Sequence, residues 1–152
     1  MVWKAEESQM DKTGSCLCGA VRFTLGDVPG QTGACHCGMC RKFSGGVYLG
    51  VQVPGGKVTF QSDDTLARYA SSAWAERGFC ARCGSSLFYR VTAPGPHHDQ
   101  HHFGLGSLDD TTGITLTEEI FIDRKPEGYA FAGDTHKMTE AEMMALFAPP
   151  ES

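Results

Sequence analysis

The chain has 152 residues, which suits a single domain with one hydrophobic core. Its formal net charge of −5 disfavours nonspecific binding to nucleic acid, and no stretch approaches the roughly 18 consecutive apolar residues of a membrane span. The 19 glycines and the scarcity of helix-period apolar patterns predict a mainly β fold of short strands joined by turns. We therefore expect neither a nucleic-acid nor a membrane partner.

The N-terminal segment is polar and lacks periodicity, so residues 1–12 are expected to form a flexible arm and residues 13–152 a single domain. This segment carries charges where a signal peptide would need an apolar run, which predicts a cytoplasmic protein. In a reducing compartment, seven cysteines favour metal binding or catalysis over disulfides.

The first cysteine pair lies in a predicted hairpin. Residues 13–25 read as a strand, a tight turn at Gly19 and a second strand. Cys16 and Cys18 are two residues apart, so they would project from one strand face and could share a metal ion. The alternative is that both are small buried hydrophobic residues.

The densest cysteine cluster runs from Cys35 to Cys40 and holds three of the seven cysteines in six residues. Thiolates bind ions such as zinc, and three of them leave one tetrahedral position open for water or substrate. His36 would point away from Cys35 and Cys37 in an extended segment. The apolar run 47–53 that follows predicts a buried strand, which places the cluster at the mouth of the core.

A third cysteine group follows two predicted strands, 57–61 and 66–70. Cys80 and Cys83 form a C-x-x-C motif with Gly84 after it and a strand beyond, which is typical of a zinc knuckle. A redox C-x-x-C would instead begin a helix.

The C-terminal half offers fewer chemical signals. Four histidines lie between His97 and His102, and we expect them to form a polar surface loop without a ligand role. Strands are predicted at 103–108 and 117–122. The spacing of Thr139 and Glu142 is that of a capping box and predicts a short packing helix that Pro149-Pro150 ends, with Met143 and Met144 filling gaps in the core.

Seven thiols divide most economically into four and three. Joining Cys16 and Cys18 with Cys80 and Cys83 closes a structural site and leaves the compact trio together, whereas adding Cys80 and Cys83 to the trio would isolate the first pair.

Four segments together resemble the glutathione-dependent formaldehyde-activating enzyme family, to which centromere protein V is related: 14–23, 35–41, 77–85 and 106–109. The resemblance spans about residues 14–134. It implies a β-tent fold of zinc-stapled, stacked antiparallel sheets. It also implies a structural zinc at Cys16, Cys18, Cys80 and Cys83 and a labile zinc at Cys35, Cys37 and Cys40. The sequence departs from the family pattern at Glu119, where we expected a histidine, which puts the substrate in question.

The activity that the resemblance implies is a carbon–sulfur lyase-type condensation of formaldehyde with glutathione to S-hydroxymethylglutathione. A zinc at the trio would accept the thiol as its fourth ligand, and Arg41 and Lys42 are candidates to bind the anionic glutathione, although both could be solvated surface charges. No residue is singled out as a general base.

Three alternatives remain. The protein could be a zinc-stabilised binding module, a redox or metal-buffering protein, or a member of the same family with another thiol or aldehyde substrate.

Overall fold

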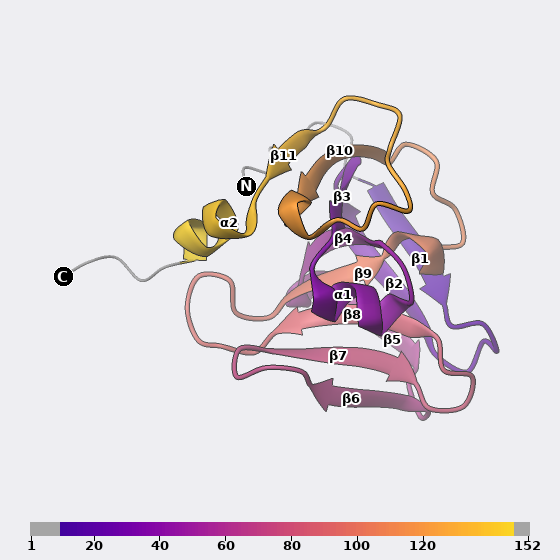
Figure 1. Cartoon of the computed structure of the whole chain (residues 1–152). Coiled ribbons are helices and arrows are strands. Elements are labelled where there is room, and N and C mark those ends of the chain that lie inside the picture. The colour runs from indigo at the N-terminus through magenta and orange to yellow at the C-terminus, as the bar shows by residue number, and fades with distance from the viewer. Residues whose placement is uncertain (1–9, 148–152) are drawn as a thin grey trace.

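Two β-sheets form the body of the protein in the computed structural model, which describes residues 10–147 (Figure 1). The smaller sheet is antiparallel and contains β1 (Met10–Ser15), β2 (Arg22–Val28) and β5 (Val58–Ser62). The larger sheet has the order β11-β10-β3-β4-β9-β8-β7-β6. Its strands are β3 (Gln31–Cys35), β4 (Tyr48–Pro54), β6 (Leu66–Ala70), β7 (Ala75–Cys80), β8 (Ser86–Val91), β9 (Gln100–Gly104), β10 (Thr115–Ile120) and β11 (His136–Met138). The mainly β prediction is confirmed.

Strand β10 gives the larger sheet its mixed character. It pairs in parallel with both β3 and β11, while the other pairings of the sheet are antiparallel. Glu119 of β10 therefore lies beside Ala34 of β3, and Ile120 lies beside Cys35. This pairing brings the region near residue 120 to the start of the cysteine trio.

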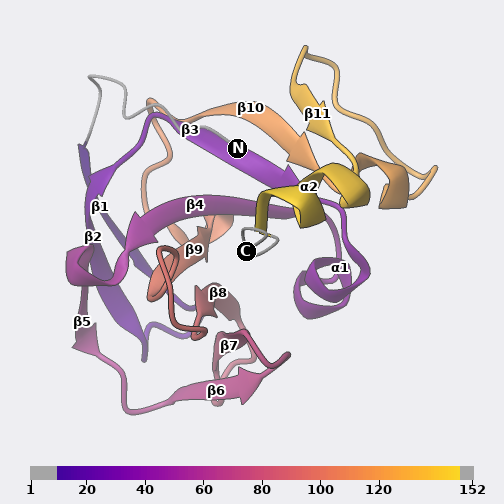
Figure 2. The same cartoon turned by 90° about the vertical axis from the view of Figure 1, so that its left-hand side faces the viewer.

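Helices α1 (Gly38–Ser44) and α2 (Glu140–Phe147) lie on the side of the molecule opposite the three-stranded sheet (Figure 2). Three short 3-10 helices complete the described part: η1 (Gly55–Lys57), η2 (Leu105–Ser107) and η3 (Ile122–Arg124). Between residues 10 and 147, no helix combines the length and apolar character needed to cross a membrane.

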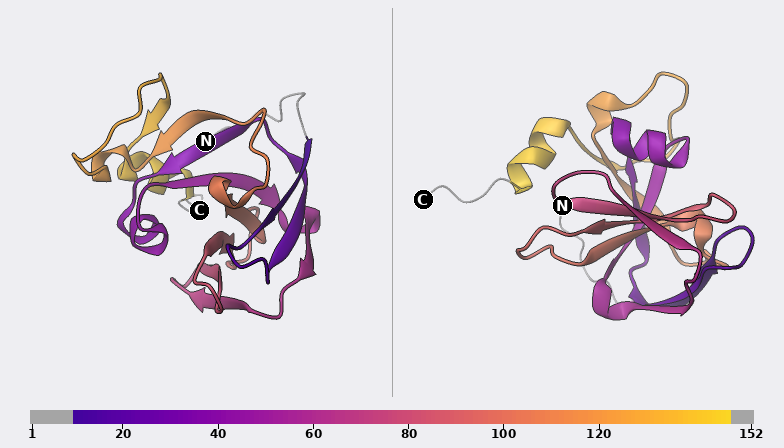
Figure 3. Two further views of the ribbon diagram at one scale, coloured as in Figure 1. Left: turned by 90° about the vertical axis from the view of Figure 1, so that its right-hand side faces the viewer. Right: turned by 90° about the horizontal axis from the view of Figure 1, so that it is seen from below.

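The hydrophobic core lies between the two sheets, and Figure 3 shows the arrangement from two further sides. Phe23 and Leu25 are alternate residues of β2, Val51 and Val53 are alternate residues of β4, and all four are buried in this core. Phe23 of β2 packs against Phe103 of β9 with ring centroids 4.5 Å apart, and Phe88 of β8 lies 5.1 Å from Phe103. Cys16 and Cys80 belong to the same buried cluster, so the first cysteine group borders the core.

Gly78 on β7 is required by this packing. A Cβ atom at that position would lie 2.2 Å from Cζ of Phe88. Because that contact is far shorter than a van der Waals distance, the Phe88 ring can cover β7 only where the strand has no side chain.

Several predicted elements need correction. Cys16 and Cys18 lie in the turn after β1 and not on a strand face, although Gly19 forms the expected turn with a φ of +80°. Residues 10–12 of the predicted arm belong to β1, and residues 1–9 fall outside the described part. The predicted strand 117–122 ends at Ile120, because Phe121 takes a left-handed φ of +56° and redirects the chain into η3.

The C-terminal helix begins where the sequence predicts. The backbone N–H of Thr139 donates to Glu142 Oε1 at 2.9 Å, and the N–H of Glu142 donates to Thr139 Oγ1 at 3.2 Å, which is the reciprocal capping box. Met143 is buried as expected, but Met144 is 52% exposed and does not fill the core. Pro149 and Pro150, the predicted end signal, lie outside the described residues.

Candidate functional site

The first cysteine group joins two turns that are distant in the sequence. The sulfur atoms of Cys16, Cys18, Cys80 and Cys83 all lie within 4.8 Å of one another. Cys16 Sγ is 3.6 Å from Cys18 Sγ, and Cys18 Sγ is 3.9 Å from Cys80 Sγ. Four thiolates at about 2.3 Å from a zinc ion would be roughly 3.8 Å apart, so the observed spacing fits a tetrahedral zinc site.

Hydrogen-bond donors surround these four sulfur atoms. The backbone N–H of Val21 donates to Cys16 Sγ at 3.3 Å, and that of Cys83 donates to Cys80 Sγ at 3.5 Å. The Ser85 hydroxyl beside Cys83 lowers the pKa of that thiol to about 5. Such donors stabilise the deprotonated thiolates that a metal needs, so the group is chemically suited to hold zinc.

Helix α1 builds the second cysteine group. Cys37 is its N-cap, with its sulfur accepting from the N–H of Cys40 at 3.3 Å, and Gly45 ends it in a left-handed conformation with φ +79°. This helix was not predicted, because thiols are not among the usual N-cap side chains and the segment lacks apolar periodicity. The Gly45-Gly46 pair was the available signal for its C-terminal end.

The trio of Cys35, Cys37 and Cys40 converges at the start of α1, and its three sulfur atoms lie within 4.8 Å of one another. Hydrogen bonds with the Cys35 and Cys40 thiols lower the pKa of Cys37, whereas hydrogen bonds with Cys37 and Cys40 raise the pKa of Cys35. One thiolate is thus already favoured without a metal. Within residues 10–147, no fourth histidine, cysteine or carboxylate joins this group, so it could hold a zinc ion with one position open.

Arg77 of β7 reaches the trio from another strand. Its side chain is buried, and its Nη1 donates to Cys40 Sγ at 3.6 Å while its Nε donates to Ser71 Oγ at 3.4 Å. The guanidinium carbon lies 5.2 Å from the Phe43 ring centroid and 4.7 Å from that of Tyr89. Arg77 was not among the predicted site residues, because no local spacing connects it with a cysteine 37 residues away.

A cavity of about 940 Å³ opens over the trio, and its walls include α1, η3 and α2. Arg41 and Lys42, the residues predicted to bind an anionic ligand, both line it. Arg41 Nε is buried and has no hydrogen-bond partner in the described part of the chain. By contrast, Arg124 at the same cavity pairs with Glu140 at 2.7 Å. Arg41 thus lines the cavity without an ion pair among the described residues.

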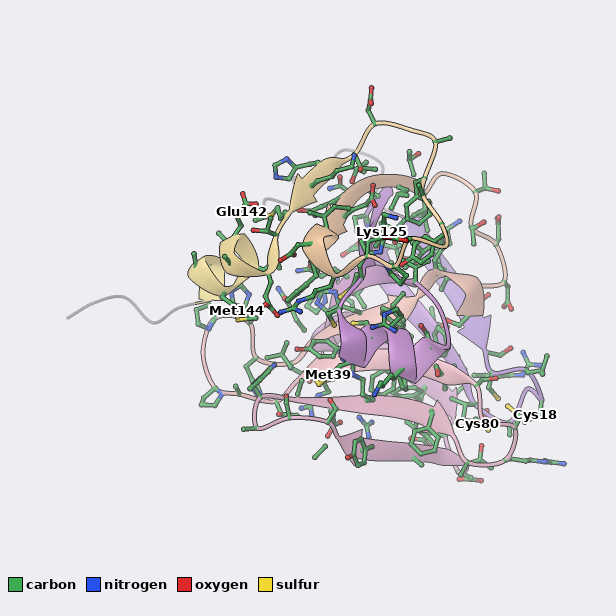
Figure 4. The ribbon with its side chains drawn as sticks, in the orientation of Figure 1. Cys18, Met39, Cys80, Lys125, Glu142 and Met144 are labelled. Atoms are coloured by element: carbon green, nitrogen blue, oxygen red, sulfur yellow. The ribbon has the colours of Figure 1, made fainter. Side chains whose placement is uncertain are left out.

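The mouth of the cavity is partly apolar. Met39, Trp74 and Met144 line it and are 44%, 50% and 52% exposed. Figure 4 labels Met39 at α1, Met144 at α2 and Lys125 between β10 and β11, while Cys18 and Cys80 lie at another end of the molecule. The two cysteine groups therefore belong to separate sites.

The His36 ring makes its hydrogen bonds with residues outside the trio, and these contacts hold the segment that carries Cys35 and Cys37. Its Nδ1 lies 2.8 Å from the Tyr129 hydroxyl, and its Nε2 lies 2.8 Å from Glu119 Oε1. The second oxygen of Glu119 accepts from the Thr135 hydroxyl and lies 3.8 Å from Lys137 Nζ. Glu119, at the position where we expected a histidine, is thus the buried partner of His36, which lies between two cysteines of the trio.

The histidine loop is partly a strand. His101 and His102 belong to β9, which corrects the expected surface loop, and His101 stacks on Phe103 with centroids 5.8 Å apart. Burial lowers the pKa of His102, which lines the cavity, to about 4, so its imidazole is neutral at pH 7. Among the described residues, none of the loop histidines joins a group suited to a metal.

The profile of the glutathione-dependent formaldehyde-activating enzyme family matches residues 11–124, which include both cysteine groups. The chain belongs to this family. An uncharacterized lyase of Schizosaccharomyces pombe is 28% identical over 131 residues, covering 86% of this chain and 93% of that protein. A Halomonas elongata protein provisionally named a glutathione-dependent formaldehyde-activating enzyme is 35% identical over 122 residues, covering 75% of this chain and 76% of that protein.

Family membership and the lyase relative support a lyase-type enzyme. The resemblance identified from the cysteine spacing is thereby confirmed as family membership. The match includes Arg77, Arg41 and Glu119 but ends at Arg124, before Tyr129 and Thr135, which complete the contacts of His36 and Glu119.

Proposed function

We propose that this family member is a zinc-dependent, carbon–sulfur lyase-type enzyme that interconverts glutathione plus formaldehyde with S-hydroxymethylglutathione. One observation carries the proposal: three thiols converge beside a large cavity, while the other four close on each other at a separate site. A purely structural pair of zinc sites would need no such opening. We also propose that the protein acts in the cytoplasm.

The two cysteine groups would hold one zinc ion each. Cys16, Cys18, Cys80 and Cys83 offer four ligands and a structural site, whereas Cys35, Cys37 and Cys40 offer three. At the trio, bound zinc would supply an acidic coordination position that favours deprotonation of an incoming thiol.

The residues around the trio would bind and orient glutathione. Arg41 and Lys42, which both line the cavity, would bind a carboxylate of the peptide. The cavity lies within the range of about 300–1,000 Å³ that is usual for small-molecule sites. The thiolate sulfur would attack the carbonyl carbon, forming a C–S bond, and the carbonyl oxygen would take the proton that the thiol released.

The exchange of formaldehyde with glutathione tests this function by two-dimensional exchange NMR. We expect the zinc-loaded protein to accelerate the exchange and Cys37→Ser to abolish the acceleration. That variant should stay folded, and its zinc content should fall from about two to about one per chain because only the open site is damaged. Unfolding of Cys37→Ser would favour a zinc-stabilised binding module, and no acceleration by the fully loaded wild type would exclude the proposed reaction.

The apolar side chains at the cavity mouth favour a second candidate substrate for the same class of reaction, in which the aldehyde is not formaldehyde. Formaldehyde and glutathione are polar, so neither explains why Met39, Trp74 and Met144 gather at one opening. An aldehyde with an apolar substituent would cover these side chains.

The same exchange measurement with hexanal in place of formaldehyde separates the two assignments. If the apolar mouth binds the aldehyde, Trp74→Ala should lower the acceleration with hexanal about fivefold or more and leave that with formaldehyde unchanged, since the lost contact is apolar. Tyr69→Ala, a change at an exposed aromatic residue outside the cavity lining, is the control. Equal effects of Trp74→Ala on both aldehydes would rule out the second assignment.

A further inference from the structure

Arg77 is a buried cation without a carboxylate partner. Its side chain is only 3% exposed, and none of the ion pairs between residues 10 and 147 includes it. Buried charges are normally paired, because removing an ion from water is costly. The sulfur of Cys40, which lies 3.6 Å from Nη1, can carry a compensating negative charge.

The position of the guanidinium is fixed on several sides. The rings of Phe43 and Tyr89 lie on it, and Ser71 accepts from Nε, so Nη1 is held toward Cys40. A planar guanidinium can stack on aromatic rings in this way, whereas a lysine ammonium would keep the charge without the stacking or the fixed direction.

The charge of the trio explains what Arg77 would do. Three thiolates and one Zn²⁺ carry a net charge of −1, and a thiolate as fourth ligand would bring it to −2. Such an accumulation of negative charge disfavours the fourth ligand in a partly buried site. A cation hydrogen-bonded to one sulfur offsets one unit of this charge.

We propose that Arg77 is a positioning residue that offsets the negative charge of the three-cysteine site and thereby allows an anionic thiolate to bind there as fourth ligand. This inference rests on the proposed function, because it assumes a metal at the trio. The three-cysteine site would then discriminate between ligands by their charge. Loss of Arg77 would lower the affinity for thiolates and leave the affinity for neutral ligands unchanged.

Cobalt-substituted protein provides the test, because thiolate-to-cobalt absorption bands report ligands at the metal without requiring turnover. The protein carrying two cobalt ions is titrated with glutathione and, separately, with imidazole as a neutral ligand. For Arg77→Met we expect about tenfold or more weaker glutathione binding and unchanged imidazole binding, since a charge-assisted hydrogen bond is lost. Arg77→Gln, which keeps a polar side chain if the methionine variant fails to fold, should show the same selective loss.

Arg68→Met is the matched control. Arg68 also lies over an aromatic ring, 5.2 Å from the Phe88 centroid, but it pairs with Glu76 and does not line the cavity. Its loss should change neither affinity. Parallel losses for glutathione and imidazole, or no loss for either, in the Arg77 variants would overturn the inference. A wild-type cobalt protein whose bands do not respond to glutathione would instead contradict the open thiol site of the proposed function.

Discussion

Replacing Cys80 with serine is expected to abolish the cooperative folding of the zinc-loaded protein. Cys80 is fully buried, belongs to the core cluster and lies 3.9 Å from Cys18, which is 62 residues away in the chain. Binding of a structural zinc contributes about 10–16 kcal/mol in small zinc domains, which equals or exceeds the whole stability of a typical domain of about 5–15 kcal/mol. A defect in this site therefore removes most of the free energy of folding.

Circular dichroism melts with parallel zinc analysis measure this effect. Wild type should unfold cooperatively with about two zinc ions, while Cys80→Ser should lack a transition and should resemble wild type treated with a strong chelator. Cys37→Ser is the internal control, because it removes a thiol from the open trio and leaves the four-cysteine group intact. A cooperative melt of Cys80→Ser near the wild-type temperature would show that the four-cysteine group does not hold the fold together.

The sequence predicted those features whose signals are local. The capping box of Thr139 and Glu142 marks α2 because both residues lie within one helical turn. The grouping of four and three cysteines followed from motif spacing, and it agrees with how the sulfur atoms gather. In both cases the residues that matter are close in sequence or belong to short motifs, so no knowledge of the strand order was needed.

The contacts that the sequence did not predict depend on the strand order. Arg77 meets Cys40 because β7 and β8 bring it under α1, and His36 meets Glu119, 83 residues away, because β10 pairs in parallel with β3. Neither contact has a spacing that a single sequence reveals. Helix α1 was not predicted for another reason. Its N-cap is the thiol of Cys37, so the start of the helix lies inside a motif that was interpreted only as a metal site.

The contact between His36 and Glu119 gives a structural role to the position at which we expected a histidine from the sequence. His36 lies between two cysteines of the trio, is fully buried, and has both ring nitrogens in hydrogen bonds. Because Glu119 holds the ring from β10, it also fixes the backbone that carries Cys35 and Cys37. Groups that hydrogen-bond directly to a metal ligand typically change metal affinity by about 10- to 100-fold when removed. Glu119 contacts His36, which is not a ligand of the trio, so we expect a smaller effect from its loss.

Glu119→Ala should therefore have two effects, on stability and on the trio. It leaves a buried histidine nitrogen without its acceptor and Lys137 without its carboxylate, so we expect a loss of about 3 kcal/mol in the free energy of unfolding. It also loosens the segment that carries Cys35 and Cys37, so zinc at the trio should be held more weakly, by less than about tenfold because Glu119 acts through His36 and not through a ligand. Urea denaturation and competition with a chromophoric chelator measure the two effects.

Glu118→Gln is the matched control for that experiment. Glu118 is the neighbouring residue on β10 and is also buried, but its side chain projects to the other face of the strand, and no ion pair involves it between residues 10 and 147. Burial raises the pKa of Glu118, so its charge is unfavourable in the folded state, and its removal should cost less than about 1 kcal/mol. If Glu119→Ala lowers stability but leaves zinc affinity at the trio unchanged, then Glu119 supports the fold without organising the metal site.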